Sequence, residues 1–146
     1  MAITQAIANS FKKLLLEGDQ NFKASGGDKF KIALYTSSAT LNSATTSFTT
    51  TNEVSNSGQY SSGGGALVNG TVSMTAGVAR ADFADRSFTG VTITARGALI
   101  YNTSSTTTNA AVCVLDFGAD KTATSGVFTI QFPANTSTAA ILRISG

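Results

Sequence analysis

Few residues of this chain have side chains that commonly act in catalysis or bind metal ions. The sequence contains no histidine and a single cysteine, Cys113, which lies in the apolar run AVCVLDF. Without histidine, neither a Ser-His-Asp triad nor a Cys-His pair can be assembled, and the commonest general base is missing. One cysteine allows no intramolecular disulfide and no cysteine-based zinc site. Cys113 is therefore expected to be a small buried apolar side chain.

Two short motifs look catalytic but lack the rest of their patterns. Residues 116–118 read DFG, the metal motif of protein kinases, yet the other kinase motifs are absent. Residues 63–65 are three glycines without the following Gly-Lys-Ser/Thr of a phosphate-binding loop. Both motifs are expected to be turns or loops next to strands.

The carboxylates also fail to form a recognisable site. Asp82, Asp85, Asp116 and Asp120 do not have the interleaved spacing of a calcium loop. With Glu53 they could supply the paired carboxylates of a glycosidase, but the chain has no tryptophan to bind a sugar ring. The sequence therefore predicts no catalytic, cofactor-binding or metal-binding residues, and a protein that is not an enzyme.

Composition points to a protein that packs against other proteins. The 146 residues fit one domain, and 42% of them are hydrophobic, enough for a real core. Only 12% are charged, about half the usual ~25%, and Ser, Thr, Asn and Gly take their place. The net charge of +2 comes from scattered basic residues, which argues against nucleic-acid binding. No apolar run reaches the ~18 residues that span a membrane, and no secretory signal is recognised, so folding in the cytoplasm is expected.

The N-terminal segment reads as an amphipathic helix over residues 3–17. Its apolar positions fall on one face, and Gly18 is placed to end it; those positions are Ile3, Ile7, Phe11, Leu14 and Leu15. Residues 19–28 contain SGG and read as a hinge. We therefore divide the chain into a helix or arm (1–18), a hinge (19–28) and a β domain (29–146). The helix either covers its own domain or docks on a partner.

From residue 29 the apolar period changes to two, as in strands. Phe30, Ile32 and Leu34 share one face, and later strands are expected within residues 110–117, 126–132 and 139–144. Asn69-Gly70 predicts a tight hairpin, and Arg96-Gly97 predicts a kink. About eight short strands with no second helical pattern predict an all-β fold, an antiparallel β-sandwich resembling a jelly roll.

The connection over residues 41–66 is long and polar, with one charge, Glu53. A connection of this length is uncommon in a compact domain and is usually functional or disordered. Phe48 between threonines predicts a short edge strand over residues 47–51, and Val54 and Tyr60 are expected to anchor the segment to the core or to a neighbour. We interpret it as a polar arm over an adjacent protein, with a disordered spacer as the alternative. The candidate partner-binding residues are Ile3, Ile7, Phe11, Leu14, Phe48, Val54 and Tyr60.

Several stretches together resemble a group of small virion structural proteins of tailed bacteriophages. They are residues 30–41 (FKIALYTSSATL), 94–102 (TARGALIYN) and 114–133 (VLDFGADKTATSGVFTIQFP), together with the pattern EV-x-x-x-GQY-x-x-GG that begins at Glu53. The match covers nearly the whole chain in order. Its motifs are structural, so it brings no catalytic residues.

The resemblance implies a structural component of the virion, and we expect a capsid decoration (cement) protein. Such a protein would bind the outer surface of the head, assemble as a homotrimer and tie neighbouring major capsid protein subunits together. Many modest contacts of this kind resist internal pressure through multivalency. Two alternatives stay open: a tail, neck or fibre component, and a glycan-binding module that would need exposed aromatics, for which Tyr60 and Tyr101 are the candidates.

Overall fold

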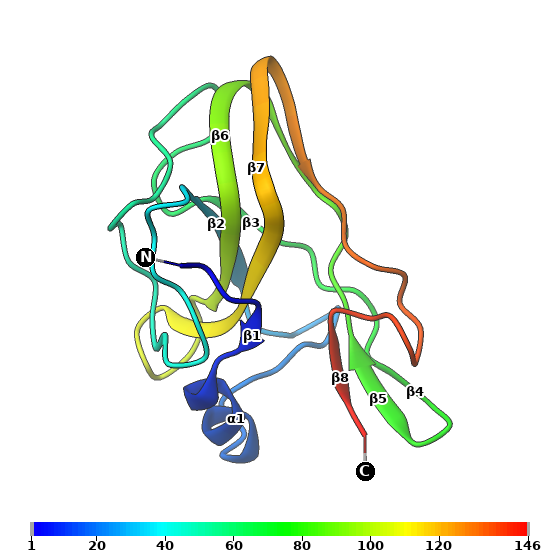
Figure 1. The fold of residues 1–146 in the computed structure, drawn as a ribbon. Helices are drawn as coiled ribbons and strands as arrows, with labels where there is room; N and C mark the ends of the chain where they lie inside the picture. Colours follow the sequence, from blue (N-terminus) through cyan, green and yellow to red (C-terminus); the bar gives the residue numbers. More distant parts are fainter. Residues whose placement is uncertain (1, 146) are drawn as a thin grey trace.

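The computed structural model describes residues 2–145, and its strand-rich architecture confirms the all-β prediction (Figure 1). The strands pair antiparallel in two sheets, one of five strands in the order β1-β7-β6-β2-β3 and one of three in the order β4-β5-β8. In chain order the elements are β1 (Ala6–Ile7), α1 (Asn9–Leu16), β2 (Phe30–Tyr35), β3 (Gly65–Ala66), β4 (Ser73–Thr75), β5 (Val78–Ala81), β6 (Arg86–Asn102), β7 (Ala110–Ile130) and β8 (Leu142–Ile144).

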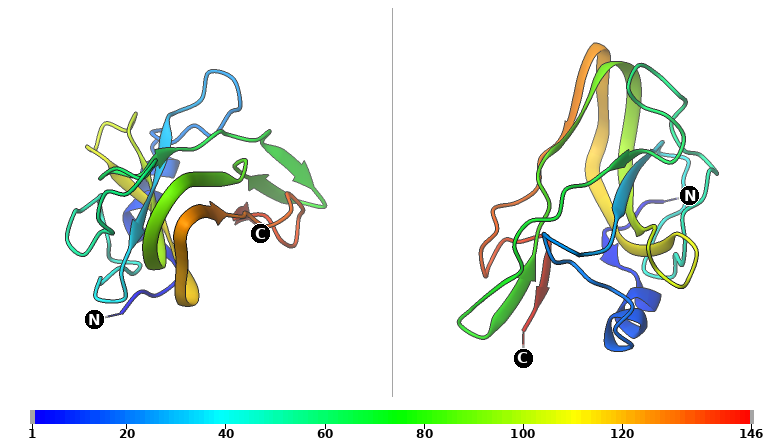
Figure 2. Two further views of the ribbon diagram at one scale, coloured as in Figure 1. Left: turned by 90° about the horizontal axis from the view of Figure 1, so that it is seen from above. Right: turned by 180° about the vertical axis from the view of Figure 1, so that it is seen from behind.

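Strands β6 and β7 form one long hairpin that bends over the top of the molecule (Figures 1 and 2). The rings of Phe117 and Phe128, both on β7, are 6.1 Å apart, so the strand folds back on itself. The sequence predicted two separate strands where β7 is continuous. Register shifts explain the difference, because bulges bend a ladder without ending it. One of them lies between Ala95 and Gly97, where the kink was predicted.

The core lies between β2, the β6–β7 hairpin and the segments around them. Phe30, Ile32 and Leu34 are fully buried, as the period of two predicted. The ring of Phe22 stacks on Phe30 with centroids 4.5 Å apart, so the segment before β2 also joins the core. Cys113 is buried as expected, and burial raises the pKa of its thiol to about 12, which keeps it protonated.

The predicted helix over residues 3–17 is wrong in its first half. The helix begins only at Asn9, while Ala6 and Ile7 pair with β7 and Ile3 bridges to Leu41. The apolar spacing suits a helix, but pairing with an existing sheet satisfies the same backbone groups and buries Ile3 as well. The shorter α1 packs on its own domain, since Phe11 belongs to the core.

The predicted hairpin at Asn69-Gly70 is also wrong. The hairpin lies a few residues later, between β4 and β5, and turns at Ala76 and Gly77, which both have positive φ. Asn69 has another role: its side-chain Nδ2 donates to the carbonyl oxygens of Lys23 and Asp28, each at 3.1 Å. It thereby fastens the segment that was expected to be a hinge.

Candidate interaction site

Most of the seven candidate partner-binding side chains are buried within the domain. Ile3, Phe11, Leu14, Val54 and Tyr60 are at most 9% exposed. Phe48 is half-buried and stacks on Tyr101 with centroids 4.9 Å apart, and Ile7 is half-buried beside the core. Ile7 and Phe11 line the groove described below, but the seven residues do not form one surface.

The polar connection over residues 41–66 is fastened to its own domain by Glu53. The carboxylate accepts hydrogen bonds from the Tyr60 hydroxyl (2.7 Å), the Ser62 hydroxyl (2.7 Å) and the Gly63 N–H (2.8 Å). The Tyr60 oxygen in turn accepts from the N–H of Leu34 on β2, at 2.8 Å. The segment is therefore an ordered part of its own domain and not a free spacer.

The edge strand predicted over residues 47–51 is reduced to one bridge, between Ser47 and Ala110. In addition to this backbone bridge, the Phe48 ring holds the segment by stacking on the ring of Tyr101. Tyr60 and Tyr101 are 0% and 2% exposed, so neither offers a ring face to a sugar. The feature that a glycan-binding module would need is therefore missing at the two predicted positions.

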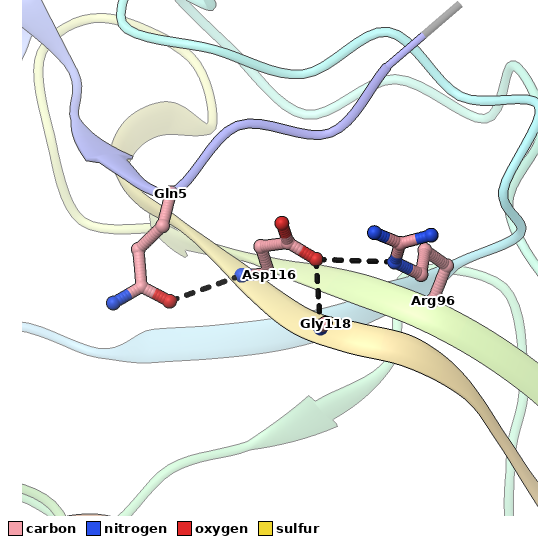
Figure 3. A network of polar contacts seen from close by, with 4 residues as sticks. All are labelled: Gln5, Arg96, Asp116 and Gly118. Atoms are coloured by element: carbon pink, nitrogen blue, oxygen red, sulfur yellow. Dashed lines mark hydrogen bonds and ion pairs between the residues drawn. The ribbon is translucent and has the colours of Figure 1, made fainter.

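A second polar network lies where β7 meets the N-terminal segment (Figure 3). Oδ1 of Asp116 accepts from Nε of Arg96 at 3.1 Å and from the N–H of Gly118 at 2.9 Å, while the N–H of Asp116 donates to Gln5 at 3.2 Å. The hydrogen bond from Gly118, and then that from Arg96, lowers the pKa of Asp116 below 3.8. The aspartate of the DFG motif therefore holds β7 to β6 through Arg96.

This network predicts a pH dependence of stability. Because the pKa of Asp116 is lower in the folded protein, its contribution is present above the ordinary value of 3.8 and is lost as the pH falls through the folded value. Asp116→Asn is expected to flatten the stability profile between about pH 5 and about pH 2, with little change in its slope above that range. Urea unfolding at each pH tests this. An unchanged acid slope in the variant would contradict it.

An open groove of about 980 Å³ lies between α1 and the three-stranded sheet. In Figure 1 α1 and the β4-β5-β8 sheet lie on opposite sides of this space. Helix α1 and the segment after it contribute Phe11, Leu15, Leu16 and Phe22 to the lining. The sheet contributes Val72, Ala79, Ala81, Leu142 and Ile144.

The three-stranded sheet presents one wholly apolar face. Antiparallel partners share a face, so the pairs Met74↔Ala79, Ala79↔Ile144 and Ala81↔Leu142 lie on one side, and Val72 joins them by alternation. Met74 is 73% exposed, Ile144 59% and Val72 47%, and Leu16 across the groove is 90% exposed. A contiguous exposed apolar surface of this kind marks an interaction site.

The lining of the groove is also positively charged and contains one hydrogen-bond donor without a partner among the described residues. Its described lining includes Lys12, Lys23, Arg80 and Arg143 and no acidic residue. Gln20, 8% exposed, also lines it, and its side-chain Nε2 has no hydrogen-bond partner among the described residues. Its Oε1 already accepts from Asn102 at 2.9 Å. The groove therefore suits an apolar segment that carries acceptors or carboxylates.

Sequence reasoning missed this groove. The sequence predicts a hairpin around Asn69-Gly70 and a strand within residues 139–144, but a period of two cannot distinguish a covered strand face from an uncovered one. The one available signal was the shortness of these strands, since three-residue strands enclose little on their own.

Comparison with known proteins adds no further assignment. No protein-family model matches the chain, and no curated protein or solved structure matches it. Within residues 2–145, no helix is long and apolar enough to cross a membrane, and no three His, Cys, Asp or Glu side chains are grouped to hold a metal ion.

Proposed function

We propose that the protein is a non-enzymatic structural component of a bacteriophage virion, a capsid decoration protein that binds the outer surface of the head. It joins neighbouring major capsid protein subunits, assembles as a homotrimer and uses no cofactor. Neither nucleic acid nor membrane is its target. We also propose that its two sheets are arranged as a jelly-roll-like β-sandwich. The sequence resemblance supplies the viral context.

The observation that carries the proposal is the apolar groove beside the three-stranded sheet. Leu16 and Ile144 line the groove, and Met74 lies on the same sheet face beside it. All three expose most of their side chains, in a chain whose surface is otherwise rich in neutral polar groups. The basic residues of the lining favour a capsid segment that combines apolar and acidic side chains. Repeated over many capsid sites, such contacts add up through multivalency.

The copy number in purified particles tests the viral role. A decoration protein is present in on the order of hundreds of copies per particle. Quantitative mass spectrometry against the major capsid protein measures this number. A count of only a few copies would move the protein to the tail, neck or fibre, and its absence from particles would end the proposal.

A charge placed in the groove is expected to prevent attachment. Ile144→Asp puts a carboxylate on the apolar face, and binding to heads stripped of the protein should fall by about tenfold or more. The matched control is Val127→Asp on β7, because Val127 is 57% exposed, against 59% for Ile144, and lies outside the groove. Co-sedimentation with heads measures both variants. Equal binding would show that the groove is not the contact.

A further inference from the structure

Strand β8 has an unpaired edge at the groove. It pairs with β5 on one side and ends the three-stranded sheet on the other. In Figure 1 β8 lies on the side of this sheet that faces β1 and α1. Ile7 of β1 and Arg143 and Ser145 line one smaller hollow as well as the main groove. The edge therefore opens into space that another chain segment can enter.

One face of β8 is apolar and the other carries a charge, and this difference determines which side chains suit a neighbouring strand. Leu142 and Ile144 belong to the apolar face, while Arg143 projects to the other. Arg143 is directly opposite Arg80 on β5, and two like charges in this position repel each other.

Neither arginine has a carboxylate partner in the described chain. The ion pairs there are Lys13–Glu17 and Arg96–Asp116. Arg80 donates to Asn135 and Thr75, and Arg143 donates only to the carbonyl oxygen of Ser137, at 3.4 Å. A strand next to β8 would place its own side chains directly opposite Arg143. An acidic residue there would offset one of the two positive charges and so reduce the repulsion between the arginines.

We infer that the groove binds an extended segment of a partner protein, which adds to β8 as a fourth strand and alternates apolar, acidic and apolar residues. Backbone hydrogen bonds to β8 supply affinity, and the side chains that alternate along the added strand supply specificity. The apolar residues extend the apolar face beside Leu142, which is buried, and Ile144, which is exposed, and the acidic residue lies opposite Arg143. This inference rests on the proposed function for the identity of the partner as a capsid subunit.

A second copy of this chain does not supply such a segment. The apolar-acidic-apolar triplet occurs twice in the sequence, at residues 81–83 and 115–117. In the first, Ala81 pairs with Leu142 and Phe83 bridges to Asn69; in the second, the Asp116 N–H donates to Gln5. Pairing β8 with β8 of another copy would also bring Arg143 close to Arg143. The charges favour a different protein.

The test uses the full chain and short synthetic peptides. The probe is the blocked peptide Thr-Val-Glu-Val-Thr, compared with a version in which lysine replaces glutamate and one with N-methylated backbone amides. Backbone NMR signals are followed during titration. The acidic peptide is expected to shift residues 142–145 and Ile7, and to bind about tenfold or more tightly than either control peptide.

Two variants with the same charge change make the test specific. Arg143→Glu is expected to reverse the preference towards the lysine peptide, whereas Lys121→Glu on β7, outside the groove, keeps it. Equal binding of the N-methylated peptide, or an unchanged preference in Arg143→Glu, would overturn strand addition. Before any peptide is added, only the amides of residues 142–144 that point towards β5 are expected to be protected from hydrogen exchange. Protection of the amides that point away from β5 would show a second copy on the edge and would also overturn strand addition. Heads that remain decorated while the peptides fail would refute strand addition alone, and a low copy number would refute the capsid role alone.

Discussion

Replacing Gly64 with alanine is expected to lower the free energy of unfolding by about 2 to 5 kcal/mol. Gly64 has φ +80°, where a side chain costs roughly 1–2 kcal/mol. A Cβ at this position would lie 1.8 Å from the carbonyl oxygen of Ile32 on the neighbouring strand, so the backbone has to move, at a further cost of about 1–3 kcal/mol. The melting temperature should fall by about 10 °C.

Gly26 provides the matched control for this substitution. It has φ +77°, but a Cβ there would have no atom within 4 Å. Gly26→Ala therefore carries the backbone strain without the collision, and about 1–2 kcal/mol is expected. Thermal and urea unfolding of both variants measure the difference. Similar losses in the two would show that β3 is free to move away from β2.

Replacing Tyr60 with phenylalanine is expected to cost about 2 to 3 kcal/mol. The hydroxyl is fully buried and makes two hydrogen bonds, accepting from the Leu34 N–H and donating to Glu53. Burial raises the pKa of Tyr60 far above its ordinary value, so the hydroxyl stays protonated and able to donate. Phenylalanine leaves the buried N–H of Leu34 unpaired, which costs about 1–3 kcal/mol. It also removes one of three donors from the part-buried Glu53 carboxylate, which costs less because the other two donors remain.

Tyr35→Phe is the control, because Tyr35 is equally buried but its hydroxyl makes one bond, to the carbonyl oxygen of Thr49. About 1 kcal/mol is expected for it. A double-mutant cycle with Glu53→Gln separates the carboxylate contact from the Leu34 contact. Additive losses for Tyr60→Phe and Glu53→Gln would mean that Glu53 does not fasten the polar connection through Tyr60.

Local patterns in the sequence predicted the strands better than the places where the chain turns. The alternation of Phe30, Ile32 and Leu34 identified β2, because residues two apart in a strand share one face. Residues 3–7 were mispredicted because their helical spacing is equally compatible with pairing to β7, which lies far away in the sequence. Asn69 was mispredicted because its amide holds two distant carbonyl groups and not a turn.

Local sequence patterns were also insufficient to predict the candidate site. Polar composition marked residues 41–66 as unusual, but it could not show that Glu53 collects three donors and closes the segment onto β2. The apolar residues Met74 and Ile144 follow the same alternation as a core strand. Only the three-dimensional arrangement shows that nothing in the described chain covers them.

The pairing of β1 with β7 has a consequence for synthesis on the ribosome. Ala6 pairs with Val114, more than one hundred residues later in the chain. At about 5–20 residues per second, the first strand waits about 5 to 20 seconds for its partner. Helix α1 follows β1 directly and forms one wall of the groove, and β8, near the other end of the sequence, forms the opposite wall. A copy released before β8 has been translated therefore lacks this part of the wall, so only a chain translated through β8 carries the complete groove that we propose binds the capsid.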